Sequence, residues 1–166
     1  MTAAIGKREL LARLHAGYDA FQQLIAPLSE AQMSAPGVQG AWSLRDVVAH
    51  FVAHEQFALH ELAAARRGER YQHPISGSDA MNAAAVAEHS ATPAGEVLHA
   101  WEASFRAVVA AVTALREDDF ADGSALTAAL GDTIDGALAN NTYEHYAEHT
   151  PALLAWLAQQ TGTRGA

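Results

Sequence analysis

Residues 98–115 read LHAWEASFRAVVAAVTAL, and this stretch decides the fold. Its large apolar side chains recur in steps of three and four residues, at Leu98, Trp101, Phe105, Val108, Val112 and Leu115. Those steps put the side chains on one face of an α-helix. A continuous apolar seam of this kind is typical of a helix packed in a bundle. Thr92 and Pro93, just before the seam, predict where that helix begins.

Three further long segments carry the same helical pattern. The first, residues 5–28, repeats apolar side chains at spacings of three and four. The second begins with Ser43 and Asp46, which form a capping-box-like pair with aspartate in place of the usual glutamate. The last starts near Asp132 or Thr133 and continues toward the end of the sequence. Each segment therefore predicts one long amphipathic helix.

The composition supports a helical protein with one core. Alanine and leucine dominate, β-branched residues are sparse, and no long alternating run argues for a strand. The 166 residues, 50% of them hydrophobic, suffice for one core of ordinary size. We therefore predict an all-α four-helix bundle that takes residues 1–166 as a single domain. A short extra helix is expected over residues 79–90, which read DAMNAAAVAEHS.

Charge and hydropathy narrow the expected partners. The formal net charge is −9, and the 10 lysines and arginines form no basic stripe, so we expect no nucleic-acid partner. No apolar stretch reaches the ~18 residues of a membrane span, and the N-terminus does not read as an export signal. We expect a cytoplasmic protein without a membrane partner. Cysteine is absent, so any thiol chemistry needs a thiol from outside.

Two histidines near the end of the sequence suggest a site. They lie in NTYEHYAEHTPAL, residues 141–153, and the apolar stripe of the last helix passes through both His145 and His149. Each inward imidazole has a polar nitrogen that needs a partner or costs roughly 1–3 kcal/mol. Spacing of four residues on a helix lets both rings bind one ion, as in the zinc proteases. A third ligand is still required.

The best third donor is His50, near the middle of the second helix. Asp46 comes one helical turn earlier and could hold the second nitrogen of the His50 ring. His54, one turn further on, is the rival donor, and position favours His50. The remaining histidines are interpreted as surface or helix-end residues: His15, His60, His73, His89 and His99.

Glu148 is the candidate general base. The letters HYAEH match the H-x-x-E-H pattern of inverted zinc proteases, but only 17 residues follow His149, too few for the third ligand of that class. The alternative is that Glu148 is a solvated helix carboxylate. Pro151 predicts either a kink beside His149 or a new helix capped by Thr150. A cleft between the second and last helices is expected to be lined by Trp42, Tyr143, Tyr146 and Glu148, although for Tyr146 packing outward or against a partner subunit is the favoured interpretation.

The sequence resembles the DinB-like four-helix bundles, and within them the DfsB/ClbS family. The resemblance covers nearly the whole chain and rests on two main stretches, GAWSLRDVVAHFVAHEQ at 40–56 and NTYEHYAEH at 141–149. Shorter matches support them, in KRELLARL at 7–14, PGVQGAWS at 36–43 and MNAAAVAEHS at 81–90.

The resemblance implies both a site and a kind of activity. Three histidines of the superfamily bind a divalent metal such as zinc or nickel, and the matching positions are His50, His145 and His149. Some members transfer low-molecular-weight thiols, and the DfsB/ClbS family includes a protein that opens the cyclopropane of a genotoxin. We therefore expect a metal-dependent enzyme that acts on a small electrophile by thiol transfer or hydrolysis. The alternative is a non-catalytic bundle that binds and sequesters a small molecule. Alanine and leucine on the outer face would allow a homodimer.

Overall fold

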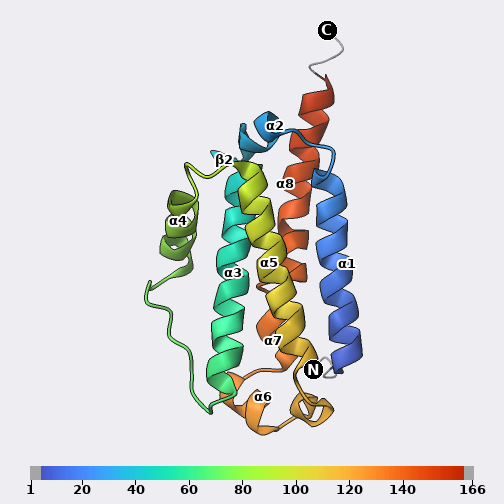
Figure 1. Cartoon of the computed structure of the whole chain (residues 1–166), viewed down its shortest axis with the longest axis vertical. Helices are drawn as coiled ribbons and strands as arrows, with labels where there is room; N and C mark the ends of the chain where they lie inside the picture. Colours follow the sequence, from blue (N-terminus) through green and yellow to red (C-terminus); the bar gives the residue numbers. More distant parts are fainter. Residues whose placement is uncertain (1–4, 163–166) are drawn as a thin grey trace.

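Four long helices form the bundle in the computed structural model, which describes residues 5–162 (Figure 1). They are α1 (Lys7–Ile25), α3 (Leu44–Ala65), α5 (Ala94–Thr113) and α8 (Tyr143–Gly162). Helices α3 and α5 run in one direction, and α1 and α8 run in the other. This order follows because a long connection carries the chain back along α3 before α5 begins. The predicted helical bundle is confirmed.

Short elements occupy the connections between the long helices. They are α2 (Glu30–Ser34), α4 (Ser78–Glu88), the 3-10 helix η1 (Glu117–Phe120), α6 (Ala125–Leu130) and α7 (Ile134–Ala139). Helix α4 is the short extra helix expected over residues 79–90, and it packs against α3 on the outside of the bundle (Figure 1).

A small antiparallel hairpin, not expected from the sequence, precedes α3. It pairs β1 (Pro36–Gln39) with β2 (Trp42–Ser43), and the register places Gln39 opposite Trp42. Gly40 has a φ of 58° in the turn, a conformation that glycine adopts without a Cβ clash. The strands are too short for an alternating apolar pattern, so periodicity could not reveal them.

The bundle core is one cluster of buried side chains drawn from all four long helices. The predicted seam of α5 supplies Trp101 and Val112, both fully buried, with Phe105 stacked on Tyr18 of α1 at a ring distance of 4.0 Å. Leu98 is only partly buried, whereas its neighbour Val97 is fully buried. At the first turn of α5, Val97 therefore takes the buried position of the seam in place of Leu98.

The predicted last helix is interrupted between α7 and α8. The break lies at Asn141 and Thr142, whose backbone N–H groups donate three residues back, to the oxygens of Leu138 and Ala139, and whose side chains donate four residues back. The Asn141 amide donates to the Ala137 oxygen at 3.2 Å, and the Thr142 hydroxyl donates to the Leu138 oxygen at 2.7 Å. Short polar side chains compete with the helix backbone in this way. The expectation of one unbroken helix from residue 132 or 133 was therefore wrong.

Pro151 does not start a new helix. Helix α8 continues through it to Gly162, and the Thr150 hydroxyl donates to the Tyr146 oxygen at 2.9 Å instead of capping a following helix. A proline inside a helix removes one backbone donor. The helix tolerates this loss while its inward face stays packed, with Leu153 fully buried.

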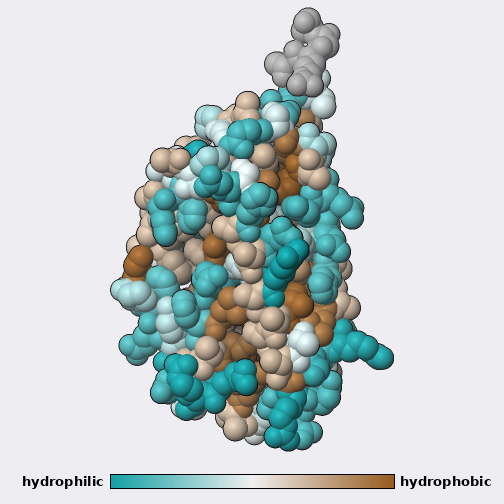
Figure 2. All heavy atoms as spheres, in the orientation of Figure 1, coloured by the Kyte–Doolittle hydropathy of each residue, from teal (hydrophilic) through white to brown (hydrophobic). Residues whose placement is uncertain are grey.

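An apolar groove runs between α3 and α5, and brown side chains gather on that face in the lower half of Figure 2. Leu59, Leu62 and Ala111 line the groove. A homodimer through this or another face stays a prediction. Among the described residues, no helix combines the length and apolar character needed to cross a membrane.

Candidate functional site

Three imidazoles converge between α3 and α8. His50 comes from α3, and His145 and His149 come from successive turns of α8. The His145 Nε2 atom lies 2.7 Å from the Nε2 of His50 and 3.2 Å from the Nε2 of His149. All three side chains are buried, at 4%, 5% and 8% exposure. The structure thus brings together the three residues that the sequence singled out.

The start of α3 sets the position of His50. Ser43 and Asp46 form a complete capping box: the Asp46 carboxylate accepts from the Ser43 backbone N–H at 2.9 Å and from the Ser43 hydroxyl at 2.8 Å. That carboxylate therefore serves the helix end. It does not hold the His50 ring, whose Nδ1 has no hydrogen-bond partner among the described residues. The expected contact between Asp46 and His50 was wrong.

Gln39 holds His149 from the opposite side, a role that the sequence did not reveal. Its side-chain oxygen lies 2.5 Å from the His149 Nδ1. An amide oxygen can only accept, so Nδ1 carries the proton and Nε2 directs a lone pair at the other two rings. The unexpected β-hairpin places Gln39 there, since β1 packs against α8. In the sequence, the only indication of this hairpin is the pair of turn-forming residues Pro36 and Gly40 before Ser43.

Burial keeps the three rings neutral. It lowers the pKa of His50 to about 3, of His145 to about 2 and of His149 to about 4, and repulsion from neighbouring imidazoles adds to the effect. Neutral imidazole is the form that binds metal ions. The cluster is therefore ready to act as a ligand set at neutral pH.

The ligand set fits one divalent ion. One nitrogen from each ring lies within 4.8 Å of the other two. Nitrogens held about 2.0–2.1 Å from a tetrahedral zinc lie roughly 3.3 Å from each other, close to the 3.2 Å between His145 and His149. The 2.7 Å between His50 and His145 would have to lengthen by about 0.6 Å around such an ion. The three buried Nε2 atoms face one another, with that of His145 in contact with the other two. A divalent cation could accept a lone pair from each of them at once.

Aromatic rings enclose the cluster. Trp42 lies 5.3 Å from His50 by ring centroids, and Phe51 lies 5.3 Å from His145. Trp42 thus stands where a cleft residue was expected. The two tyrosines lie elsewhere: Tyr143 points toward α7 and donates to the Asp135 carboxylate, and Tyr146 is 1% exposed in the core. Outward packing of Tyr146 was therefore also wrong.

Glu148 lies on the exposed side of α8, away from the three rings. It does not belong to the group of side chains in the described part of the chain that could share one ion. Its role as a general base stays a prediction.

His54, the rival ligand, packs beside the cluster without joining it. Its ring centroid lies 4.4 Å from that of His50 and 4.3 Å from that of His145. Its nitrogens turn outward, to the side-chain oxygens of Asn141 and Asn82, each at 3.0 Å. The interruption between α7 and α8 places Asn141 at this point. His54 is therefore a neighbour of the candidate metal ligands.

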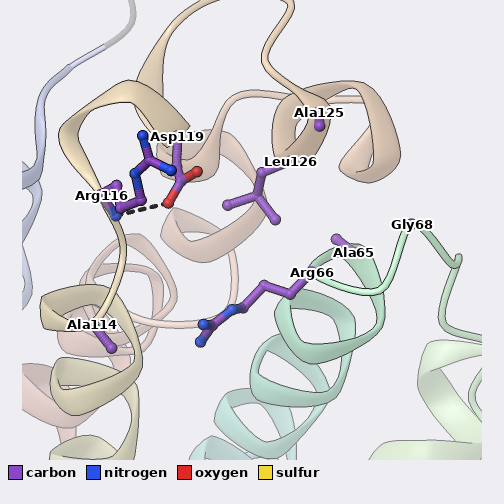
Figure 3. A pocket seen from close by; sticks show the side chains of 8 residues that line it. All are labelled: Ala65, Arg66, Gly68, Ala114, Arg116, Asp119, Ala125 and Leu126. Carbon is purple, nitrogen blue, oxygen red and sulfur yellow. Dashed lines mark hydrogen bonds between the residues drawn. The ribbon is translucent and has the colours of Figure 1, made fainter.

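A separate depression lies at the far end of α3, close to α6 (Figure 3). Arg66 points toward it, and Asp119 accepts a hydrogen bond from the Arg116 backbone N–H at 2.7 Å. Fifteen residues of α3 separate Ala65, in its wall, from His50, a distance of roughly 22 Å along a helix. The depression is not part of the histidine site.

Comparison with known proteins identifies the fold. Residues 13–157 match the sequence profile of the DinB superfamily. The colibactin self-resistance protein ClbS, crystallised in complex with a double-stranded DNA, shares the fold with a TM-score of 0.75 and 13% identity, over 93% of this chain and 96% of that chain. An uncharacterised protein from Escherichia coli UTI89 gives a TM-score of 0.78 at 14% identity, over 94% and 95% of the two chains. A protein from Streptococcus pneumoniae gives 0.73 at 13% identity, over 93% and 91%. Curated protein sequences give no significant match.

The DNA in the ClbS crystal corrects one prediction. Nucleic acid was excluded as a partner because the chain is acidic and lacks a basic stripe. A protein of the same fold was nonetheless crystallised with double-stranded DNA, so the exclusion is withdrawn. Net charge and the lack of a basic stripe in the sequence do not exclude such a partner, because contact depends on the local field at the folded surface.

Proposed function

This chain belongs to the DinB superfamily, and from that membership we propose that His50, His145 and His149 form a divalent-metal centre that acts on a small electrophilic molecule. The observation that carries the proposal is the convergence of three buried, neutral imidazole nitrogens from two helices. Zinc or nickel suits such a ligand set, because both bind imidazole nitrogen well. The ClbS relative is a colibactin self-resistance protein, and that role is compatible with chemistry on a reactive compound.

The protein residues supply the ligands, their orientation and an apolar surround. Three protein ligands leave a coordination position open, as in catalytic rather than structural zinc sites. The chemistry that such an ion supplies is Lewis-acid activation, which lowers the pKa of a water molecule or a thiol toward neutrality. Gln39 fixes the His149 tautomer, and Trp42 and Phe51 shield the centre with apolar surface. The reaction is then hydrolysis or thiol transfer.

Thiol transfer requires a low-molecular-weight thiol as cosubstrate, since the chain has no cysteine of its own. A protein without cysteine also cannot be alkylated at a thiolate by its own substrate. Protection of the host from a reactive compound is the biological role that we propose.

Metal analysis of the purified protein tests the proposal. We expect one zinc or nickel ion per chain after purification without chelator, and loss of that ion in His145→Ala. His99→Ala is the matched control, because His99 is an exposed histidine of α5. Loss of the ion in the control as well, or no stoichiometric metal in the native protein, would contradict the proposal.

Turnover separates an enzyme from a sequestering protein. Monochlorobimane, a small electrophile that becomes fluorescent on thiol transfer, can be offered with cysteine or glutathione. A metal-dependent rate above the uncatalysed reaction supports the enzyme. The metal-loaded protein is instead a sequestering protein if it binds electrophiles but converts them neither by thiol transfer nor by hydrolysis.

A further inference from the structure

A cavity of about 250 Å³ lies beside the histidine centre, between α3, α4 and the joint of α7 and α8. We call it the α4 cavity. Its lining includes His54, Phe57, His73, Ile75, Met81 and Asn141. The loop before α4 supplies His73 and Ile75, and the first turn of α4 supplies Met81. The connection between α3 and α5, which contains α4, therefore lies against α3 beside the histidine centre.

His54 connects the cavity to the centre. It lines the cavity, and its ring packs against both His50 and His145, at 4.4 and 4.3 Å between centroids. One imidazole therefore separates the cavity from the converging nitrogens. Trp42 and Gln39 lie on other sides of the centre, against His50 and His149. A molecule held in the α4 cavity would approach the centre past His54.

The walls select an uncharged, flat ligand. The lining residues include no lysine, arginine, aspartate or glutamate. Phe57, Ile75 and Met81 supply apolar surface, and Phe57 faces the rings of His73 and Tyr71 at 6.1 and 5.5 Å. A buried cavity of roughly 150 Å³ holds benzene, so the space here suits one or two rings. Ile75 is 37% exposed and marks the outer rim.

Both ring nitrogens of His54 have partners in the protein. The Asn141 amide nitrogen is engaged by the Ala137 carbonyl, so its oxygen accepts from His54 Nδ1–H. The His54 Nε2 atom lies 3.0 Å from the side-chain amide of Asn82. Two asparagine side chains therefore fix the His54 ring in the wall between the cavity and the centre.

We propose that the α4 cavity binds the organic substrate of the histidine centre, and that this substrate is an uncharged aromatic or heteroaromatic molecule of one or two rings. The claim that the bound molecule is a substrate rests on the proposed function. The binding site itself rests on the cavity, its walls and His54. The two can therefore fail separately.

Methionine methyl signals give a direct test with indole as the probe, an uncharged two-ring molecule with one N–H. Met81 is in the cavity wall, whereas Met33 is buried elsewhere in the core. In protein labelled at the methionine methyl groups, indole should shift the Met81 signal saturably and leave Met33 unmoved. A Met81→Leu variant assigns the signal. No Met81 shift up to the solubility limit, or equal shifts of both signals, would overturn the proposal.

Matched probes and variants test the ligand class. Indole-3-acetate, which adds a negative charge, should bind at least about tenfold more weakly than indole. Phe57→Ala should weaken indole about tenfold, while Leu59→Ala, a substitution of similar burial on the same helix outside the cavity, should not. Equal binding of indole and indole-3-acetate, or equal effects of the two variants, would contradict the assignment.

Metal substitution tests whether the cavity serves the centre. In protein loaded with Co²⁺, the bound indole protons should relax faster than in protein loaded with Zn²⁺, because a paramagnetic ion acts over short distances. Equal relaxation with Co²⁺ bound would separate the cavity from the centre and overturn the proposal. Failure of the protein to bind any metal, with the Met81 shift retained, would instead refute the proposed function and keep a binding site for indole-like molecules.

Discussion

The Glu55 carboxyl group accepts a hydrogen bond from the hydroxyl of Tyr146 in the middle of the bundle. The same oxygen accepts from the Trp101 indole N–H at 2.8 Å, while the other oxygen has no partner among the described residues. Glu55 is fully buried. Burial raises the pKa of its carboxyl from 4.5 to about 7, and the pKa of Tyr146 rises well above 10. The pair joins α3 to α8, and Trp101 adds α5 to the same carboxyl group.

Glu55→Gln should remove one source of pH dependence from the stability. The folded protein holds the Glu55 proton more tightly than the unfolded chain, so unfolding releases a proton between pH 4.5 and 7, and stability falls as the pH rises through this window. Between pH 5 and pH 8 the native protein should lose about 2–3 kcal/mol relative to the variant. Urea unfolding at a series of pH values measures the difference, in which the contributions of the histidines cancel.

Glu96→Gln is the control for this measurement, since Glu96 is an exposed carboxylate in the first turn of α5. Its stability difference from the native protein should stay constant with pH. A Glu55→Gln difference that is equally constant would show that the buried carboxyl does not hold its proton into the neutral range.

Gly17→Ala should destabilise the contact between α1 and α8. A Cβ added at Gly17 would collide with the Cβ of Tyr143 and lie 2.9 Å from its Cα. Backbone cannot move aside as a flexible side chain does, so a loss of about 1–3 kcal/mol is expected. Gly95→Ala, in α5, would meet only ordinary contact at 3.7 Å and should change stability by less than about 1 kcal/mol. Similar thermal unfolding of the two variants would contradict this close approach.

The sequence predicted those helices that bury a regularly spaced apolar face in the core. The seam of α5 and the stripe through His145 and His149 are such cases, because burial of an apolar face needs spacings of three and four. His50 followed for the same reason, since its helix had a recognisable cap and a regular pattern. Three residues far apart in the sequence could thus be assigned to one site.

Contacts made by irregular segments could not be predicted. Gln39 reaches His149 only because a hairpin too short for a periodic signal folds over α8. The break at Asn141 depends on side-chain competition for backbone carbonyls, which the apolar stripe does not encode. The burial of Glu55 depends on donors from two other helices, Trp101 of α5 and Tyr146 of α8, which the pattern of its own helix does not encode.

Asp46→Ala should weaken the fold and leave the metal centre nearly intact. Its carboxylate closes the capping box with Ser43 at the start of α3, and loss of such a cap costs about 1–2 kcal/mol. No described contact joins it to His50, so the metal affinity of the folded variant should stay within about threefold of the native value. Chemical denaturation and competition with a chelator measure the two quantities. A large loss of affinity in a fully folded variant would restore the contact that the sequence suggested.

Gln39→Ala should lower the metal affinity and leave the stability of the fold nearly unchanged. The substitution removes the acceptor that holds the His149 Nδ1 proton, and loss of such a supporting hydrogen bond typically lowers metal affinity about 10–100-fold. Stability without metal should change by less than about 1.5 kcal/mol, because one hydrogen bond on a partly exposed hairpin is lost. Gln23→Ala, an exposed glutamine of α1, is the control and should change neither property. Chelator competition on the three proteins decides the matter: equal affinity of Gln39→Ala and Gln23→Ala would mean that His149 keeps its orientation without Gln39.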